Sequence, residues 1–295
     1  MKAICVGHST FDITLPMTEY PKENVKYRIK NHVDCGGGPA SNGAYLLAKW
    51  GVDTSIVSVV GNDYYGDRIV EEFRNIGANI DYLERHDNHR TTSSYIIMNL
   101  SNGTRTVLSS KDESIRKLNQ KIDCKADVIL IDGEHPETAK EVLNNNLDAI
   151  SVLDAGRLTE DTKELGKKVT YLVCSKNFAE EFANKKINIS NLGELIEIYR
   201  ELETFFQANI IITLEADGSF ARIDGVCQLI PSIKVKALDS TGAGDVFHGA
   251  FVYFISNGYS LYETIRLASV TAAISVEKIG ARKSIPSLDE VLEYV

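Results

Sequence analysis

The chain has 295 residues, of which 43% are hydrophobic, and its formal net charge is −9. This length and apolar content allow a single α/β domain with a buried core and a small appendage. The negative charge and the lack of any Lys- or Arg-rich run exclude nucleic acid and anionic membrane surfaces as the main partner.

The apolar runs and the cysteines indicate the compartment. No apolar run reaches the length of a membrane span, and the one near the N-terminus is too short for the core of a signal peptide. The cysteines are odd in number and form no C-x-x-C pair, which is typical of reduced thiols in a cytosolic protein. We therefore expect a cytoplasmic protein that does not associate with membranes. The five cysteines are Cys5, Cys35, Cys124, Cys174 and Cys227.

Short apolar segments alternate with amphipathic helical stretches along most of the chain. Helices are bracketed by Pro39 and Gly51 and by Gly66 and Gly77, and a further helix begins at Pro136. This alternation predicts a parallel sheet that is covered by helices on both faces. The predicted buried strands are residues 3–6, 55–60, 128–131, 150–153, 171–173 and 210–213.

Two stretches, residues 13–35 and 92–108, contain predicted strands outside this alternation. The second stretch is predicted to be a hairpin that turns at Asn102-Gly103. Together they are expected to form a small β-sheet over the ligand edge of the main sheet, as a lid that excludes water.

The C-terminal third is predicted to be mainly helical, with helices at residues 245–256 and 261–278. A last helix is expected to begin with a capping box between Ser287 and Glu290. No repeat and no linker divides the sequence, so residues 1–295 are interpreted as one domain.

The segment from Leu238 to Ala250 contains the most informative motif. Gly242, Ala243 and Gly244 leave backbone N–H groups unobstructed at a helix N-terminus, which favours a bound anion such as phosphate. Asp245, in the first helical turn, could accept a proton from a hydroxyl that attacks this phosphate. An Asp-capped, Gly-rich turn without a ligand is the structural alternative.

Two other phosphate-binding motifs are absent. The sequence has no G-x-x-x-x-G-K-[ST], and Phe247 stands where a dinucleotide-binding motif beginning at Gly242 would need its third glycine. A P-loop NTPase and a nucleotide-binding oxidoreductase are therefore disfavoured.

The segment 239–245, Asp-Ser-Thr-Gly-Ala-Gly-Asp, resembles the signature of the ribokinase-like (PfkB) family of carbohydrate kinases. The segment 36–42, Gly-Gly-Gly-Pro-Ala-Ser-Asn, followed by Gly51 and by Gly61-Asn-Asp, resembles the N-terminal signature of that family. The resemblance covers nearly the whole chain. It implies a doubly wound sheet with a β-lid, ATP and Mg²⁺ at the C-terminal edge of the sheet, and a sugar hydroxyl directed at Asp245.

The resemblance also implies an acceptor site. Asp12 matches an aspartate that binds sugar hydroxyls, and a carboxylate can accept hydrogen bonds from two of them. Gly37 and Gly38 would let the backbone approach the ligand, and Asn42 would add an amide contact. Arg105 resembles a lid arginine of ketohexose-handling members. The structural alternatives are a solvated loop for Asp12, a flexible turn for the glycines and a solvated hairpin charge for Arg105.

A nucleotide site follows from the same resemblance. Asn177 and Glu180 match an Asn-x-x-Glu motif that organises Mg²⁺ and its waters, and their spacing places both on one helix face. Thr213 and Gly218 match nucleotide-contacting positions, although Glu215 stands where many members have glycine. An ordinary polar helix face is the alternative for the Asn-x-x-Glu pair.

A cation site is the last feature that the resemblance implies. Some relatives bind a monovalent cation such as K⁺ beside the anion site. The matching residues are Asp239, Thr241, Gly280 and Ser284.

The histidines and strand-end aspartates receive simpler interpretations. His86 and His89 lie in a polar loop without a third ligand and are interpreted as solvated. Asp132 and Asp154 end predicted strands and either approach the site or form turns. His248 is interpreted as packing in the core or contacting nucleotide.

The resulting hypothesis is in-line phosphoryl transfer from MgATP to a small sugar, with Asp245 as the base. Thr10 and Pro39 replace the Asn and Lys of ribokinases proper, which favours a ketohexose or modified hexose, as in ketohexokinase-, fructokinase- or sulfofructose-kinase-like members. Ribose, 2-keto-3-deoxygluconate and nucleosides remain alternative acceptors, and a non-catalytic sugar or nucleotide sensor is the alternative of another class. Lids in this family often pair, which suggests a homodimer.

Overall fold

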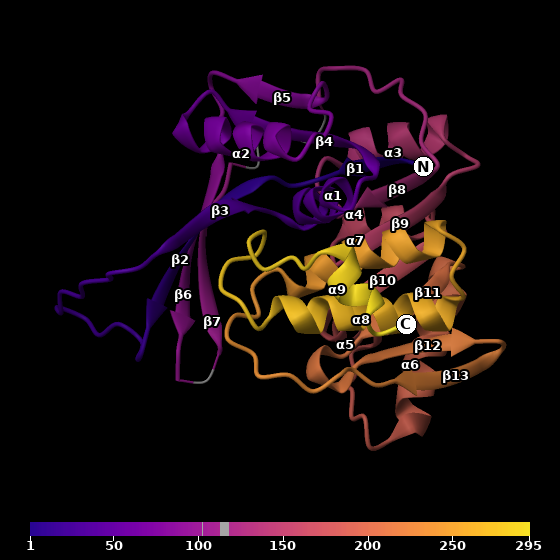
Figure 1. Cartoon of the computed structure of the whole chain (residues 1–295). Helices are drawn as coiled ribbons and strands as arrows, with labels where there is room; N and C mark the ends of the chain where they lie inside the picture. Colours follow the sequence, from indigo (N-terminus) through magenta and orange to yellow (C-terminus); the bar gives the residue numbers. More distant parts are fainter. Residues whose placement is uncertain (102, 113–117) are drawn as a thin grey trace.

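A computed structural model describes residues 1–101, 103–112 and 118–295. Its main sheet has the strand order β13-β12-β11-β10-β9-β8-β1-β4-β5 (Figure 1). These strands are β1 (Lys2–Val6), β4 (Asp53–Gly61), β5 (Leu83–His86), β8 (Val128–Ile131), β9 (Ile150–Ala155), β10 (Tyr171–Ser175), β11 (Asn209–Thr213), β12 (Ser219–Ile223) and β13 (Val226–Ile230). The strands from β5 to β11 are parallel, and the β12–β13 hairpin is antiparallel.

After β1 the chain adds β4 and β5 on one side of this strand, and it then crosses back to add β8 and the later strands on the other side. The sheet is therefore doubly wound, as predicted. Ligands of such sheets bind outside the carboxyl ends of the strands, where the winding reverses. That position is the carboxyl end of β1 and β8.

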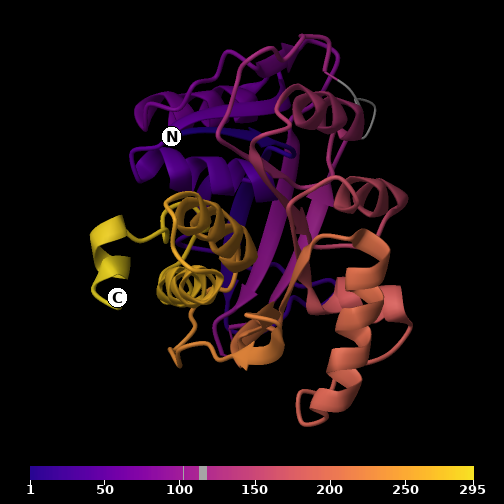
Figure 2. The same cartoon turned by 90° about the vertical axis from the view of Figure 1, so that its right-hand side faces the viewer.

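Helices cover both faces of the sheet (Figures 1 and 2). The apolar strands contribute side chains to a hydrophobic core on each face of the sheet. In β1, Ala3 and Cys5 belong to one core, and Ile4 and Val6 belong to the other. The helices are α1 (Pro39–Lys49), α2 (Tyr64–Asn75), α3 (Pro136–Asn145), α4 (Glu160–Gly166), α5 (Lys176–Ala183), α6 (Leu192–Phe206), α7 (Ala243–Ser256), α8 (Leu261–Ser275) and α9 (Leu288–Leu292). Helices α1, α7 and α8 contribute to the first core, and α3 to α6 to the second.

A second sheet projects from the body of the molecule in Figure 1. Its strand order is β3-β2-β6-β7. The strands are β2 (Thr10–Met17), β3 (Val33–Gly37), β6 (Thr92–Asn99) and β7 (Arg105–Ser110). Strand β2 begins at Thr10, earlier than the predicted stretch, because the chain continues almost directly from β1. Asn102, at the predicted hairpin turn, lies outside the described residues.

The remaining differences from the sequence predictions have local causes. Strands β5, β12 and β13 were not predicted, although Asp224 and Gly225 both adopt positive φ in a turn type that favours Asp-Gly hairpins. Helix α8 ends at Ser275, before the predicted residue 278. The capping box of Ser287 and Glu290 is present at the start of α9. No helix among the described residues is long and apolar enough to cross a bilayer.

Candidate active site

The N-terminus of α7 forms an open turn. Gly242 is the N-cap residue with a φ of 76°, and Asp245 lies in the first turn of the helix. A Cβ on Gly244 would meet no atom within 4 Å, whereas a Cβ on Gly242 would lie 2.8 Å from the Cβ of Ala281. The first N–H groups of a helix lack intrahelical acceptors. The turn therefore offers these donors beside open space at Gly244.

Asn42 and Asp245 meet across 203 residues of sequence. The Nδ2 atom of Asn42, on α1, donates a hydrogen bond of 2.7 Å to Oδ2 of Asp245. Helices α1 and α7 approach closely enough for this because glycines face each other, and a Cβ on Gly249 would lie 3.0 Å from the Cα of Gly43. Asn42 is buried, so its amide has a fixed position beside the carboxylate.

Asp12 lies in β2, where its carboxyl group is buried, so the alternative of a solvated loop is wrong. Thr10 donates a hydrogen bond of 2.7 Å to its Oδ1. Burial raises the pKa of Asp12 to about 6, against hydrogen bonds from Thr10 and Ser94, and the charge of Asp245 acts in the same direction as burial. The two carboxylates are therefore close enough to interact.

The glycines at the start of α1 are required by contacts within the chain. A Cβ on Gly37 would lie 2.1 Å from Oδ2 of Asp12, and one on Gly38, where φ is 98°, would lie 2.2 Å from the carbonyl oxygen of His8. The flexible turn considered from the sequence is therefore a tightly packed segment.

Asp132 fixes the same region from the end of β8. Its Oδ2 accepts hydrogen bonds from the backbone N–H groups of His8, at 2.9 Å, and Ala40, at 3.0 Å. Burial raises the pKa of Asp132 to about 7, although these hydrogen bonds oppose the shift. Asp132 thus ties the end of β1 to the start of α1.

Arg105 extends from the lid toward the turn before α7. Its Nη1 donates a hydrogen bond to Oγ of Ser240. Gly103 lies next to Ala237, because a Cβ atom on Gly103 would lie 3.3 Å from the carbonyl oxygen of Ala237. The β6–β7 end of the second sheet therefore contacts the segment that leads into α7.

Asn177 and Glu180 both lie on α5 and line one shallow pocket. Asn177 is exposed. Glu180 is buried, and its oxygens are engaged by the backbone N–H of Ile187, at 3.0 Å, and by Nζ of Lys186, at 2.6 Å. This carboxylate is suited to a hydrated metal ion rather than to direct ligation.

Thr213 and its neighbours make mainly local contacts. Thr213 Oγ1 donates a hydrogen bond of 3.3 Å to the carbonyl oxygen of Cys174. Glu215, at the position where the resemblance leads us to expect glycine, has a φ of 56°, a left-handed conformation that residues with a side chain rarely adopt. A Cβ on Gly218 would lie 2.1 Å from the carbonyl oxygen of Ile230.

The four residues proposed for a monovalent cation come from residues 239–241 and residues 280–284, and the side chain of Asp239 connects these two segments. Its Oδ1 accepts a hydrogen bond of 2.9 Å from the N–H of Thr241, and its Oδ2 accepts one of 3.0 Å from the N–H of Gly280. Thr241 Oγ1 is buried and has no hydrogen-bond partner within the described part of the chain. Ser284 Oγ donates to the carbonyl oxygen of Ala281 at 2.9 Å. An unpartnered oxygen beside a carboxylate fits a cation that prefers oxygen ligands.

His248 is buried and contacts the first turn of α7. Its Nδ1 lies 2.6 Å from the carbonyl oxygen of Gly244 and 3.1 Å from Oδ2 of Asp154, and its Nε2 lies 3.1 Å from the carbonyl oxygen of Val173. Burial raises the pKa of Asp154, and the facing His248 opposes this shift. Both residues therefore support the turn from inside.

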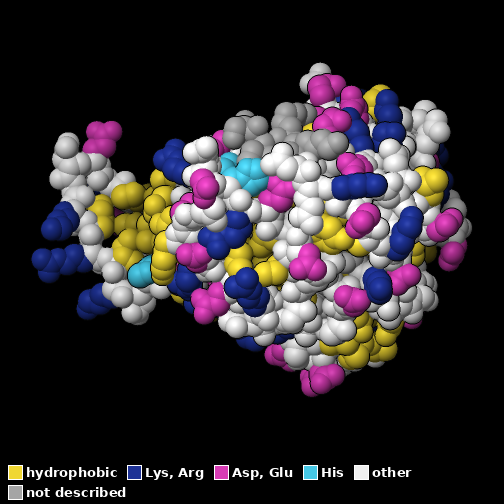
Figure 3. Space-filling model, turned by 90° about the horizontal axis from the view of Figure 1, so that it is seen from above, with side chains coloured by type: hydrophobic (Ala, Val, Ile, Leu, Met, Phe, Trp, Pro, Cys, Tyr) yellow, Lys and Arg dark blue, Asp and Glu magenta, His cyan; other side chains and the backbone are white. Residues whose placement is uncertain are grey.

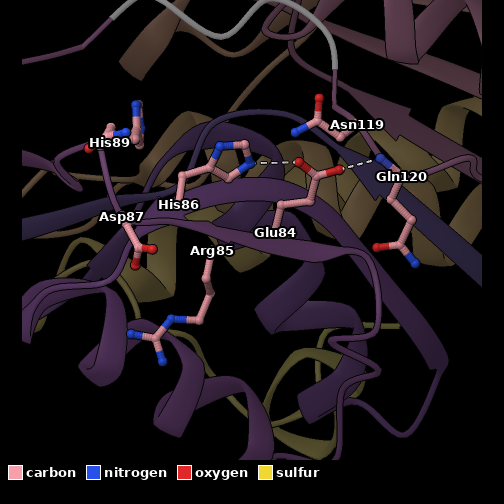
Figure 4. Close-up of a pocket in the computed structure, with 8 residues that line it drawn as sticks. Glu84, Arg85, His86, Asp87, His89, Asn119 and Gln120 are labelled. Carbon is pink, nitrogen blue, oxygen red and sulfur yellow. Dashed lines mark hydrogen bonds and ion pairs between the residues drawn. The ribbon is translucent and has the colours of Figure 1, made fainter.

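The prediction of solvated side chains is wrong for His89, which is buried, whereas His86 is partly exposed. His86 Nε2 lies 2.7 Å from Oε2 of Glu84, and His89 is buried with its Nδ1 3.2 Å from Asp112. Figure 4 shows His86 pointing toward Glu84 in a pocket at the edge strand β5. Burial by a distant segment, which local polarity does not reveal, explains the error.

Arg282 has no counterpart among the predicted site residues. Its side chain is 2% exposed and donates a hydrogen bond of 3.2 Å through Nε to Oδ1 of Asn42. The Gly-Ala-Arg sequence that contains it carries no recognisable motif, so only the folded structure identifies it.

Comparisons with known proteins agree over the whole chain. The model of the family described as pfkB family carbohydrate kinase matches residues 1–288. A ribokinase from Bacillus subtilis is 27% identical over 304 aligned positions, which cover 100% of both chains. A nucleoside kinase from Methanocaldococcus jannaschii is 27% identical, with 99% of this chain and 96% of the relative covered. The crystal structure of a ribokinase from Thermotoga maritima superposes with a TM-score of 0.82 at 25% identity, covering 99% of this chain and 98% of that one.

Proposed function

The chain belongs to the pfkB family of carbohydrate kinases, and from this premise we propose that it transfers the γ-phosphoryl group of ATP in line to a hydroxyl of a small sugar, with Asp245 as the base. Membership of this family makes the chain an ATP-dependent sugar or nucleoside kinase. The identity of the acceptor and the roles of individual residues are the parts that we propose.

One observation carries the assignment of the base. Asp245 lies in the first turn of α7, beside the open space at Gly244, and Asn42 Nδ2 binds its Oδ2 at 2.7 Å. Because Oδ2 takes this hydrogen bond, Oδ1 is left to receive the proton of an attacking hydroxyl. The base and the anion site then share one helical turn, as in-line transfer requires.

The N–H groups of Gly242, Ala243 and Gly244 would stabilise the charge of the transferring phosphoryl group. Asn177 and Glu180 would hold Mg²⁺ through its waters, and the bound ion would neutralise charge on the phosphates. The engagement of Glu180 by Lys186 supports such contact through water. Thr213 and Gly218 would adjoin the nucleotide, because Thr213 ends β11 and Gly218 lies in the turn that follows this strand.

We also propose a monovalent cation, such as K⁺, beside the anion-binding turn. The buried Oγ1 of Thr241, which has no hydrogen-bond partner among the residues that the structure describes, and the carboxylate of Asp239 support this site. Gly280 and Ser284 would complete it from the following loop. A cation there would hold the turn that begins α7.

Asp12, Gly38 and Asn42 would position the acceptor, and Arg105 would close the lid over it. The buried carboxylate of Asp12 can bind vicinal hydroxyls, which supports a polyhydroxylated acceptor. Thr10 and Pro39 favour a ketohexose or modified hexose, whereas the names of the relatives make ribose and nucleosides the principal rivals. 2-Keto-3-deoxygluconate is the remaining candidate.

We propose a cytoplasmic homodimer that pairs through the lid. All five cysteines are free thiols, which suits a reducing compartment. Val107 and Leu108 in the edge strand β7 are 49% and 54% exposed, and Tyr95 is 40% exposed. An edge strand with exposed apolar residues favours pairing with a second copy. Sedimentation of the wild type and of Leu108→Lys tests this, because only the wild type should be dimeric.

The decisive experiment is a screen for ADP release with MgATP and each candidate acceptor. The acceptors are fructose, sulfofructose, ribose, 2-keto-3-deoxygluconate and nucleosides. ADP release that depends on one added sugar would support the kinase and identify its acceptor. Tight binding of sugar or ATP without turnover on any acceptor would instead indicate a sensor.

A further inference from the structure

Arg282 is a buried cation in the loop between α8 and α9, and its guanidinium group makes three different contacts. Nε donates to Oδ1 of Asn42 at 3.2 Å, and Nη2 donates to Oγ of Ser41 at 2.6 Å. Nη1 forms an ion pair of 2.8 Å with Oε2 of Glu72. The guanidinium thus joins α1, α2 and the C-terminal loop at a point adjacent to Asp245.

The side chain of Arg282 is held in one conformation by its neighbours. Its Cζ lies 4.5 Å from the ring centroid of Phe73 and 5.1 Å from that of Tyr45, within the range of cation–π contacts. A Cβ on Gly36 would lie 2.1 Å from Nη1, so only glycine fits at that position. The side chain is therefore fixed by packing as well as by hydrogen bonds.

The positive charge of Arg282 is compensated by Glu72, which also binds the backbone of β3. Glu72 accepts hydrogen bonds of 2.9 and 3.1 Å from the backbone N–H of Gly36, the residue before Gly37 in β3. A buried cation without such a partner would be strongly destabilising. The ion pair therefore allows a permanent donor to be placed beside the site.

A permanent donor determines the orientation of the Asn42 amide. Guanidinium has donors only, so the amide atom that faces Arg282 must be Oδ1. Because the amide is planar, Nδ2 then faces Asp245, which agrees with its 2.7 Å bond to Oδ2. Without Arg282, the amide could rotate and accept a hydrogen bond from Asp245 once that residue carries a proton.

We propose that Arg282 is a positioning residue that locks the Asn42 amide, so that Asn42 always donates to Oδ2 of Asp245 and the acceptor's proton goes to Oδ1. This inference rests on the proposed function of Asp245. It extends that function by explaining how the base presents the same oxygen before and after it takes the proton.

A double-mutant cycle between Arg282→Lys and Asn42→Ala tests whether Arg282 acts through Asn42. Lysine keeps the charge but loses the planar fork, so Arg282→Lys should lower kcat about 10- to 100-fold and change the KM for ATP little. In the Asn42→Ala background, the same substitution should change kcat less than about twofold. Equal effects in both backgrounds would overturn the proposal.

Two further variants separate positioning from structural or charge effects. Glu72→Gln breaks the ion pair but leaves the contact between Arg282 and Asn42, so it should lower the melting temperature and largely preserve kcat. A loss of kcat equal to that of Arg282→Lys would contradict the proposal. Lys283→Gln removes the neighbouring, exposed cation and should alter neither quantity.

A measurement without substrate distinguishes this inference from the proposed function. The NMR signals of the Asn42 side-chain amide can be identified in ¹⁵N spectra because they are missing in Asn42→Ala. The hydrogens of this amide should exchange slowly with solvent in the wild type. Arg282→Lys should accelerate their exchange about tenfold or more, because the amide loses its fixed orientation. Unchanged exchange would overturn the locking role, whereas a wild type inactive on every acceptor would count only against the proposed kinase mechanism.

Discussion

The acceptor half and the nucleotide half of the candidate site are built differently. In the acceptor half, Asp12 and Asn42 are buried, and Asn42 and Asp245 are hydrogen-bonded to each other. In the proposed nucleotide half, Asn177 is exposed, Glu180 binds the nearby Lys186, and Thr213 binds the carbonyl oxygen of Cys174 on the neighbouring strand. The proposed acceptor half is thus preorganised by side chains from distant elements, while the proposed nucleotide half would rely on backbone donors and on the open space at Gly244.

This difference predicts where substitutions act. Changes in the acceptor half should lower kcat or weaken acceptor binding, because they disturb a fixed set of side chains. Changes in the nucleotide half should act mainly on kcat/KM for ATP. Figure 3 shows the lid, with its hydrophobic and basic side chains, projecting from the body that carries both halves.

The largest expected effect is on the base. Asp245→Asn removes the proton acceptor while keeping the size of the side chain, so kcat should fall about 10³-fold with the acceptor still bound. ADP release and calorimetric titration of the acceptor measure the two quantities. A variant that retains kcat would remove Asp245 as the base.

The next effect tests the nucleotide half. Gly244→Ala puts a methyl group into the open space proposed for phosphate, so kcat/KM for ATP should fall about 10- to 100-fold. The fold should be unaffected, because nothing lies within 4 Å of that methyl position. Gly193→Ala, in the first turn of α6, is the matched control and should leave activity unchanged, with a melting temperature that is the same or slightly higher because alanine favours the helix. Unchanged kinetics for Gly244→Ala would place the phosphate elsewhere.

A pH profile tests the acceptor half at Asp12. Because burial raises the pKa of Asp12 from its ordinary range to about 6, this group gains its proton as the pH falls below about 6 and accepts fewer hydrogen bonds. The KM for the acceptor should rise about fivefold between pH 6 and pH 5, as the ionised fraction of Asp12 falls. Asp12→Asn should have a higher KM that does not follow this pH dependence. A wild-type KM that is constant over this range would contradict a role for the Asp12 carboxylate.

The smallest expected effect concerns backbone strain in the nucleotide half. Glu215 has a φ of 56°, and glycine adopts this conformation without steric cost. Glu215→Gly should raise the free energy of unfolding by up to about 1 kcal/mol, since the relief of strain exceeds the added chain entropy of glycine. Urea denaturation measures this change. Asp217→Gly, in the same 3₁₀ turn but without positive φ, should not stabilise the protein.

The sequence alone predicted features that depend on neighbouring residues. The glycine turn that begins α7 and the place of Asp245 in its first turn follow from the segment 239–245, because caps and turns are set within a few residues. The parallel sheet followed from apolar runs such as those of β1 and β8, which are buried on both faces. The resemblance added the positions of Asp12 and Asn42.

Only the tertiary structure decided which of these groups touch. Asn42 meets Asp245 because glycines let α1 and α7 pack closely, and Arg282 meets Asn42 across 240 residues because Asp239 binds the loop that carries it. His89, polar in its local sequence, is buried for the same kind of reason. Local patterns determine the secondary structure, but contacts between distant segments depend on the packing of the whole chain, and that packing positions the base.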